Sequence, residues 1–172
     1  MTRKLFLAGA ALVSLGFSHA ALAQASAQAT ASGSTTIIRP VTVTKTADLQ
    51  FGRIVKPATG DGTVSMANAA DAVTAGSGAM ALSGTTSRAK FTINGEGAMG
   101  VSLTVPASFE MSNGTDQIVV TLDPDLGATT TLSGAAGAAG TKALNVGGSF
   151  SVPAAISTGA FVGTFDVTVA YN

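Results

Sequence analysis

The sequence predicts an all-β fold, an antiparallel β-sandwich or barrel, and three observations lead to this prediction. First, about ten short runs rich in β-branched and aromatic residues are separated by turn signals roughly every 8–12 residues. Second, no segment shows a convincing helical period. Third, the chain of 172 residues is 46% hydrophobic and only 10% charged. That composition is the opposite of the low hydrophobicity and high net charge that mark a disordered chain.

The first 23 residues are typical of a secretory signal peptide. Arg3 and Lys4 give a basic start, residues 5–17 are apolar, and the small-x-small sequence at residues 21–23 ends the segment. The apolar run is shorter than the ~20 residues that a helix needs to span a bilayer. We therefore expect export, cleavage after Ala23 and no membrane insertion of the mature chain.

Removal of this leader sharpens what the composition excludes. The chain has no Cys and no Trp, and its one histidine, His19, leaves with the leader. Seven basic and nine acidic residues remain, a net charge of −2. Without His and Cys, neither a Ser-His-Asp nor a Cys-His site can form, and the usual zinc ligands are missing. We expect no enzyme activity and no cofactor, and the charge gives no reason to expect a nucleic-acid partner.

Residues 24–36 are predicted to form a flexible N-terminal extension, because they are Gln, Ala, Ser, Thr and Gly. Within this extension, alanines alternate with polar residues at the period of a β-strand. These alanines are Ala25, Ala27, Ala29 and Ala31. The β-sandwich domain is predicted over residues 37–172.

The predicted strands follow in order along this domain. They are residues 37–46, 49–54, 62–66, 90–93, 101–105, 108–111, 118–122, 129–132, 143–146, 149–152 and 161–171. The dipeptides at residues 94–95 and 113–114 are Asn-Gly, which favours tight turns. Residues 67–80 could hold one helical turn, and the Gly-rich residues 134–140 are predicted to be a flexible loop.

Three motifs could carry a binding or catalytic function, but each has a simpler structural interpretation. Residues 95–100 match G-x-G-x-x-G, but a strand follows where a dinucleotide site needs a helix, so a hairpin turn is expected. Glu96 and Glu110, the two glutamates of the chain, could form an acid–base pair, although solvated surface positions are expected. A few aspartates could supply oxygen ligands to Ca²⁺, but their spacing lacks the known loop pattern: Asp116, Asp123 and Asp125. No metal site is therefore predicted.

The last segment carries the sharpest pattern in the chain. Tyr171 is the penultimate residue, and Gly159 is fourteenth from the end. Between them, glycine and large apolar residues alternate with other residues and fall on one face of a strand: Phe161, Gly163, Phe165, Val167 and Val169. The segment is either the terminal core strand of a sandwich or a strand that another protein binds.

Tyr171, Gly159 and the alternating strand between them resemble the C-terminal signature of chaperone–usher pilus subunits. The resemblance implies an incomplete immunoglobulin-like sandwich whose last strand pairs with a periplasmic chaperone. It also implies that the N-terminal extension of a neighbouring subunit completes the sandwich by strand exchange, a form of β-augmentation. Residues 24–36 would then be a possible donor strand, which Ile37, Val41 and Val43 could extend.

A second resemblance covers residues 37–172. Residues 37–52, 89–95, 144–148 and 163–172 are similar to the opening, middle and end of a bacterial secreted family of unknown function, number 4402. The resemblance implies an exported, all-β and pilin-like protein without an established activity.

Two hypotheses follow from these observations. The first is an exported structural subunit of a fimbria-like surface fibre, assembled by β-strand exchange. Its expected partners are a periplasmic chaperone, an outer-membrane usher, and further copies of itself or other pilus subunits, and its expected location is the periplasm and then the cell surface. The second is a self-contained secreted β-sandwich that acts as a monomeric surface or ligand-binding module, in which residues 24–36 are an idle linker.

Overall fold

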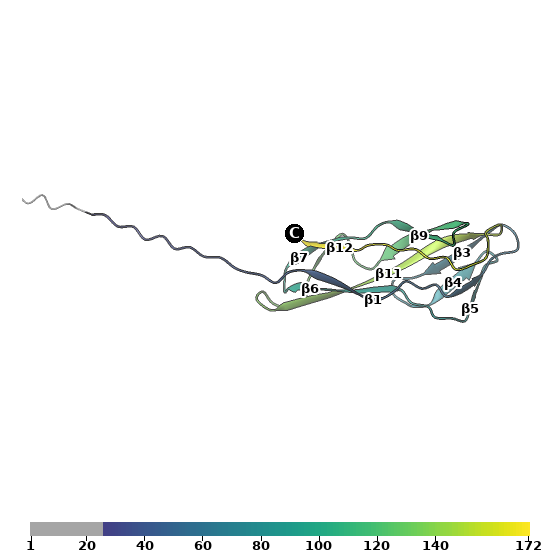
Figure 1. The fold of residues 1–172 in the computed structure, drawn as a ribbon. Helices are drawn as coiled ribbons and strands as arrows, with labels where there is room; N and C mark the ends of the chain where they lie inside the picture. Colours follow the sequence, from purple (N-terminus) through teal and green to yellow (C-terminus); the bar gives the residue numbers. More distant parts are fainter. Residues whose placement is uncertain (1–25) are drawn as a thin grey trace, which may run out of the picture. The chain divides into compact units, whose positions relative to one another are not determined.

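Twelve strands and no helix occur in residues 26–172, the part of the chain that the computed structural model describes (Figure 1). The predicted signal peptide and Ala25 lie outside these residues. No helix within them is long and apolar enough to cross a bilayer. Residues 36–172 form one compact unit, whereas residues 26–35, in a separate unit, are exposed and contain no strand.

The strands are short except for one. Their bounds are β1 Thr42–Ala47, β2 Arg53–Val55, β3 Asp61–Met66, β4 Val73–Gly76, β5 Met80–Leu82, β6 Ala89–Glu96, β7 Gly100–Thr104, β8 Ser108–Ser112, β9 Gln117–Pro124, β10 Thr129–Thr131, β11 Ala139–Pro153 and β12 Thr168–Tyr171.

All pairings between these strands are antiparallel. The largest sheet has the order β1-β6-β11-β3-β4, and β9 joins it by pairing with both β11 and β8. A second sheet has the order β10-β7-β12, and β2 pairs with β5. These antiparallel sheets curl around one core, which is consistent with an immunoglobulin-like β-sandwich and confirms the predicted fold class (Figure 1).

Period-two alternation puts the core between the sheets. Ile93 of β6 and Leu144 of β11 are completely buried, as are Val101 of β7 and Val120 of β9. β6 is paired on both sides, with β1 and with β11. The apolar rows of these central strands therefore fix the centre of the molecule.

Tertiary pairing overrides three local predictions. The Asn94-Gly95 turn is wrong, because both residues pair with β11 and the strand continues to Glu96. Residues 143–146 and 149–152 are one strand, β11, which runs through Gly147 and Gly148 and begins inside the predicted 134–140 loop. Residues 67–80, which could have held a helical turn, instead contain β4, which pairs with β3.

Candidate functional site: an apolar groove between two rims

The chain segment before β12 differs from the predicted strand. Only Thr168–Tyr171 is paired, with β7, and a single bridge joins Val162 to Ser112 of β8. The predicted burial pattern is nevertheless present, because the large apolar residues of the row pack against the core: Phe161, Phe165, Val167, Val169 and Tyr171. Residues 161–167 are thus buried on one face like a strand but lack a continuous partner.

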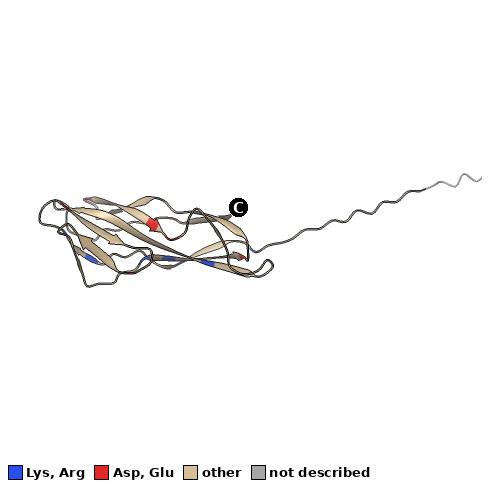
Figure 2. Ribbon diagram, turned by 180° about the vertical axis from the view of Figure 1, so that it is seen from behind, with Lys and Arg blue, Asp and Glu red and all other residues tan. Residues whose placement is uncertain are grey.

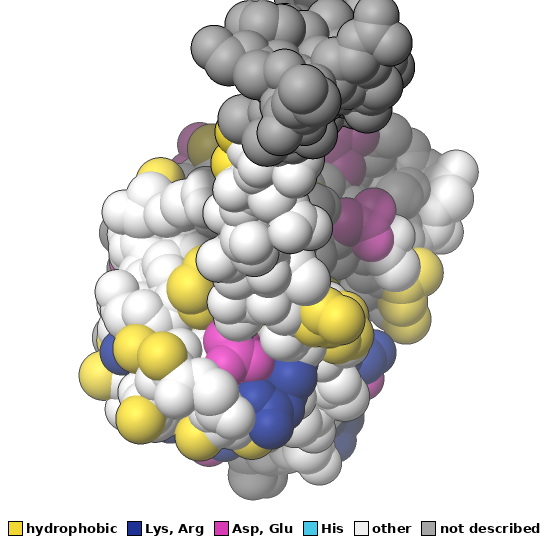
Figure 3. All heavy atoms as spheres, turned by 90° about the vertical axis from the view of Figure 1, so that its left-hand side faces the viewer, with side chains coloured by type: hydrophobic (Ala, Val, Ile, Leu, Met, Phe, Trp, Pro, Cys, Tyr) yellow, Lys and Arg dark blue, Asp and Glu magenta, His cyan; other side chains and the backbone are white. Residues whose placement is uncertain are grey.

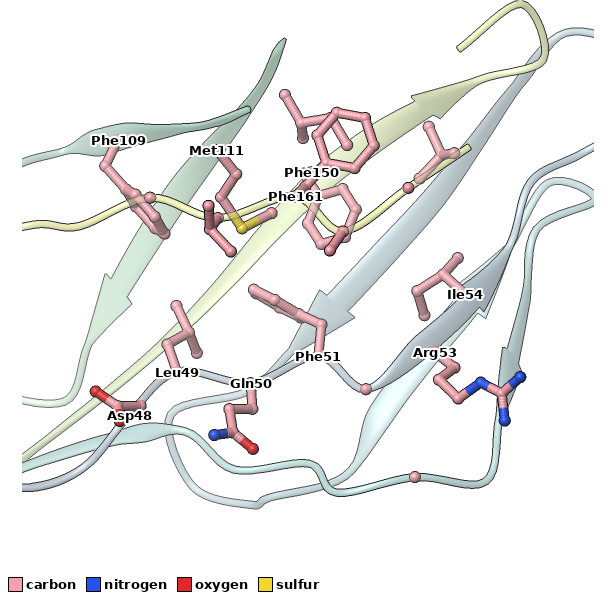
Figure 4. A pocket seen from close by; sticks show the side chains of 18 of the residues that line it. Asp48, Leu49, Gln50, Phe51, Arg53, Ile54, Phe109, Met111, Phe150 and Phe161 are labelled. Carbon is pink, nitrogen blue, oxygen red and sulfur yellow. The ribbon is translucent and has the colours of Figure 1, made fainter. Parts of the chain in front are cut away.

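A groove lies alongside this segment. Its cavity has a volume of about 940 Å³ and runs between two stretches of chain. We name residues 45–56 the first rim and residues 156–165 the second rim. Figure 4 shows Phe51, Phe150 and Phe161 directed toward the space between them, together with Met111.

The floor of the groove is apolar and aromatic, whereas Lys45, Asp48, Arg53 and Lys56 line its first rim. Phe51 and Phe150 meet edge to face at 4.9 Å between ring centroids, and Phe109 lies 5.1 Å from Phe165. The polar side chains of Asp48 and Gln50 point away from this aromatic cluster (Figure 4). Lys, Arg, Asp and Glu are sparse on the ribbon as a whole (Figure 2). The groove therefore offers apolar contact without a cluster of converging charges.

Both rims leave backbone groups without a protein partner. Among the described residues, no hydrogen bond is found for the backbone N–H groups of residues 158–161 and 163–166. On the first rim, β1 is an edge strand with β6 on one side only, and Gln50 pairs with Ser87 while Leu49 and Phe51 make no backbone hydrogen bond. An extended segment in the groove could pair with both rims, because unpaired strand edges accept further strands.

Gly163 fixes how the second rim packs. A side chain added there would collide with the backbone of Glu110 in β8. The missing side chain lets the segment lie against β8 on one side, which leaves its other side facing the groove. Gly159 lies in the exposed part of this rim, and its φ of 149° favours glycine.

A junction of hydrogen bonds joins the two rim-bearing segments beyond the groove. The Tyr171 hydroxyl donates to the Arg39 carbonyl over 2.8 Å and accepts from the Glu96 N–H over 2.7 Å. The Glu96 carboxylate accepts from the Arg39 guanidinium at 2.9 Å and from the Gly137 N–H at 2.5 Å. We call these four residues the junction.

Glu96 is the buried centre of the junction, with a side chain that is 7% exposed, whereas that of Arg39 is 48% exposed. Burial favours the neutral carboxyl, but hydrogen bonds from Arg39 and Gly137 and the charge of Arg39 outweigh it and lower the Glu96 pKa. Acidic and basic side chains lie side by side at this end (Figure 3). Glu96 is thus neither solvated nor paired with Glu110, which is exposed on β8.

Two of the remaining candidates for chemistry have structural partners, and Asp123 is exposed on β9. Asp116 accepts from the Ser157 N–H, and Asp125 accepts from Asn145. In the described part of the chain, no group of three or more His, Cys, Asp or Glu could hold a metal ion. The glycines of residues 95–100 lead from β6 into β7, so a strand follows the motif, as predicted. The expected hairpin turn is wrong, because β6 and β7 do not pair and belong to different sheets.

Sequence reasoning did not find the first rim, the Glu96 junction or Lys56. Lys56 donates to the Ile156 carbonyl over 2.7 Å and so crosses from one rim to the other. No spacing rule connects residues that are 57 or 100 positions apart. The one available signal was Glu96 itself, because a glutamate in a glycine-rich apolar stretch needs a partner.

The structure does not test the predicted donor role of the alanines. Ala27, Ala29 and Ala31 lie in the exposed, unpaired segment before the domain. Val43 is part of β1 and pairs with Ile93, and Val41 packs against the core. These two valines are therefore packed or paired within the domain, while Ile37 is 92% exposed.

An antiparallel, immunoglobulin-like sandwich with an open apolar groove defines the class of this protein. A family model described as domain of unknown function (DUF4402) matches residues 41–171, and the chain belongs to this family. Neither a curated protein nor a solved structure matches the chain.

Proposed function

We propose that this protein is an exported, non-enzymatic structural subunit of a surface fibre, assembled by β-strand exchange. The observation that carries the proposal is the apolar groove, whose two rims have unpaired backbone. A groove for a small molecule needs apolar walls and a few polar groups, but it has no use for two free strand edges. An inserted strand uses both features, because main-chain hydrogen bonds hold it while alternate side chains fill the groove.

The donor in this proposal is residues 24–36 of a second copy. The described part of this segment is exposed and makes no strand pairing within its own chain. Its alanines would face the aromatic floor, which places small side chains against large ones, as in packed cores. A surface that accepts a different surface of the next copy gives a head-to-tail contact, which grows into a fibre when it does not close into a ring.

A periplasmic chaperone and an outer-membrane usher are the partners that fit this proposal. The groove exposes apolar surface until a donor arrives, and an exported subunit with such a surface needs protection from non-specific association. A chaperone strand in the groove would supply that protection during export.

The direct test compares the chain from residue 24 with a variant that lacks residues 24–36. We expect the longer chain to form polymers on concentration and the shorter one to stay monomeric while still binding a synthetic 24–36 peptide. A peptide with Asp at the four alanine positions is the control and should not bind. If neither chain ever polymerises and no peptide binds, the proposal is wrong.

A self-contained monomeric module is the second candidate, and one observation favours it. β12 already pairs with β7 within the domain, so the end of the chain does not need an external partner. In that case the groove would hold a small apolar ligand, and the shorter variant would bind such a ligand but no peptide.

A further inference from the structure

Two contacts join the rim-bearing segments, one at an end of the groove and the other beyond its opposite end. At one end Lys56 donates to the Ile156 carbonyl, and beyond the other end Tyr171 donates to the Arg39 carbonyl. Between these bridges, the cavity is lined along the second rim from Ile156 to Phe165. The length available to an inserted strand is therefore limited by the protein itself.

The two bridges differ in strength. The Lys56 bridge is a single hydrogen bond from a flexible side chain. When this side chain moves aside, water solvates its ammonium group. The junction instead combines a half-buried Tyr171 with a buried, ionised Glu96 that accepts hydrogen bonds from two different segments. Charge-assisted hydrogen bonds to a buried carboxylate are about twice as strong as neutral ones.

The junction also has no room to open by a small adjustment. A side chain at Gly95 would collide with the Tyr171 hydroxyl and with Leu132, so the tyrosine ring is held closely against β6. Beyond the cavity, β1 lies beside β12, and the two segments converge toward the hydrogen bond between Arg39 and Tyr171.

We infer that the Arg39–Glu96–Tyr171 junction holds β1 beside β12 and so acts as a fixed stop that closes the groove beyond Phe165. It limits the inserted segment to about nine residues and leaves the Lys56 end as the entrance. The estimate of nine comes from residues 157–165 of the second rim, which an antiparallel or parallel partner matches one for one. At ~3.3 Å per residue this is roughly 30 Å of extended chain.

This inference rests on the proposed function, and it specifies the partner segment. The occupant is a nine-residue stretch of the 24–36 extension of a second copy, with its alternate residues facing the floor. Because the chain enters its own domain next to the junction, at Arg39, the donor leaves one end of a subunit and enters the next subunit at the Lys56 end. This polarity agrees with head-to-tail growth.

A peptide-length series tests the stop. The probes are synthetic peptides of 7, 9, 11 and 13 residues that follow the sequence from residue 24 onward, with leucine at the alternating positions to strengthen binding. Binding to the chain that lacks residues 24–36 is measured by fluorescence anisotropy. We expect the affinity to rise up to about nine residues and then to stay within about twofold, because further residues find no groove.

Two variants of the junction sharpen the test. In Tyr171→Phe and Glu96→Gln, the affinity should keep rising beyond nine residues, and the 11-residue peptide should bind more than about tenfold tighter than the 9-residue one. Burial of one further leucine is worth at least this factor. Glu110→Gln, which changes the other glutamate and leaves the junction intact, is the matched control and should keep the plateau. Circular dichroism and thermal unfolding establish that each variant folds.

The outcomes distinguish a failure of the proposed stop from a failure of the proposed strand exchange. If peptides bind but the affinity of the wild type keeps rising through 13 residues, the stop is wrong and strand exchange stands. If the wild type shows the plateau but neither variant changes it, the groove has another limit and the junction is not the stop. If no peptide binds at any length, the proposed function is wrong and the stop falls with it.

Discussion

The centre of the main sheet and the second rim of the groove have the same kind of alternating sequence but differ in how they pair with neighbouring strands. β6 and β11 alternate apolar and polar residues, bury the apolar row and pair with neighbours on both sides. Residues 156–165 also direct apolar residues toward the core, yet they share one bridge with β8 and face a cavity on the other side. The difference shows that alternation determines which face is buried, while pairing depends on whether a neighbour is present.

The largest effect is expected in the paired centre. Leu144→Ala should lower the free energy of unfolding by roughly 2–5 kcal/mol, because Leu144 is completely buried and its removal leaves a cavity. Urea unfolding followed by circular dichroism measures the change. A loss as small as that of a surface substitution would break the distinction between the sheet centre and the rim.

Phe165→Ala tests the rim in the same way. Phe165 is half-buried, so we expect a loss of roughly 1.5–2.5 kcal/mol, about half of the cost of truncating a fully buried phenylalanine. The same variant should lose peptide binding, which Leu144→Ala should not do if it is measured well below its unfolding transition. Equal peptide affinity of the wild type and Phe165→Ala would contradict the proposal that the groove binds the peptide.

Tyr171→Phe removes a single hydroxyl from the junction. The expected loss is about 1 kcal/mol, because the Glu96 N–H and the Arg39 carbonyl each lose a hydrogen-bond partner. Urea titration measures the change, and hydrogen exchange should show faster exchange at Glu96. A neutral result would mean that Glu96 and Arg39 hold the junction without the tyrosine.

Acid should weaken the junction and two surface sites together. The pKa of Asp71 is lowered mainly by a hydrogen bond from Lys90, and that of Asp116 mainly by hydrogen bonds from Ser157. The Glu96 pKa is also below its ordinary value. Carboxyl groups whose pKa is lower in the folded state stabilise it above the unfolded-state pKa, and this stabilisation is lost as pH falls through the folded-state pKa.

We therefore expect the urea midpoint to be steady from pH ~7 to ~5 and to fall below pH ~4. Glu96→Gln should reduce this acid dependence. An acid dependence of Glu96→Gln equal to that of the wild type would contradict the assigned role of the buried carboxylate.

The smallest effect is expected on the exposed face of β1. Lys45 and Asp48 form an ion pair, but both side chains are more than half exposed. Lys45→Ala should change the free energy of unfolding by less than about 0.5 kcal/mol, because water screens such pairs. A larger loss in the same urea assay would show that the first rim depends on this contact.

The sequence was sufficient for the fold class and for the buried faces, because both follow from local periodicity. The alternation predicts that Phe161, Phe165 and Tyr171 share one face, and each packs against the core. The strand bounds were less predictable. Asn94 and Gly95 have strong turn propensity, but pairing of both with β11, and of Asn94 also with β1, outweighs it.

The groove itself could not be predicted from the sequence. Its first rim comes from residues 45–56 and its second from residues 156–165, and only the folded topology brings them together. The junction has the same origin, because Arg39, Glu96 and Tyr171 are joined across 57 to 132 positions of sequence. The alternation in residues 161–171 indicated a partner strand but not where that partner would lie.

Amide hydrogen exchange of residues 163–166 tests the central claim most directly. These N–H groups have no partner in the described structure, while the neighbouring Thr168–Tyr171 strand is paired with β7. In the chain without residues 24–36, we predict fast exchange at 163–166 and slow exchange within β12, and addition of the 24–36 peptide should slow the first group selectively. Slow exchange at 163–166 without peptide, or no change on saturating peptide, would contradict the account.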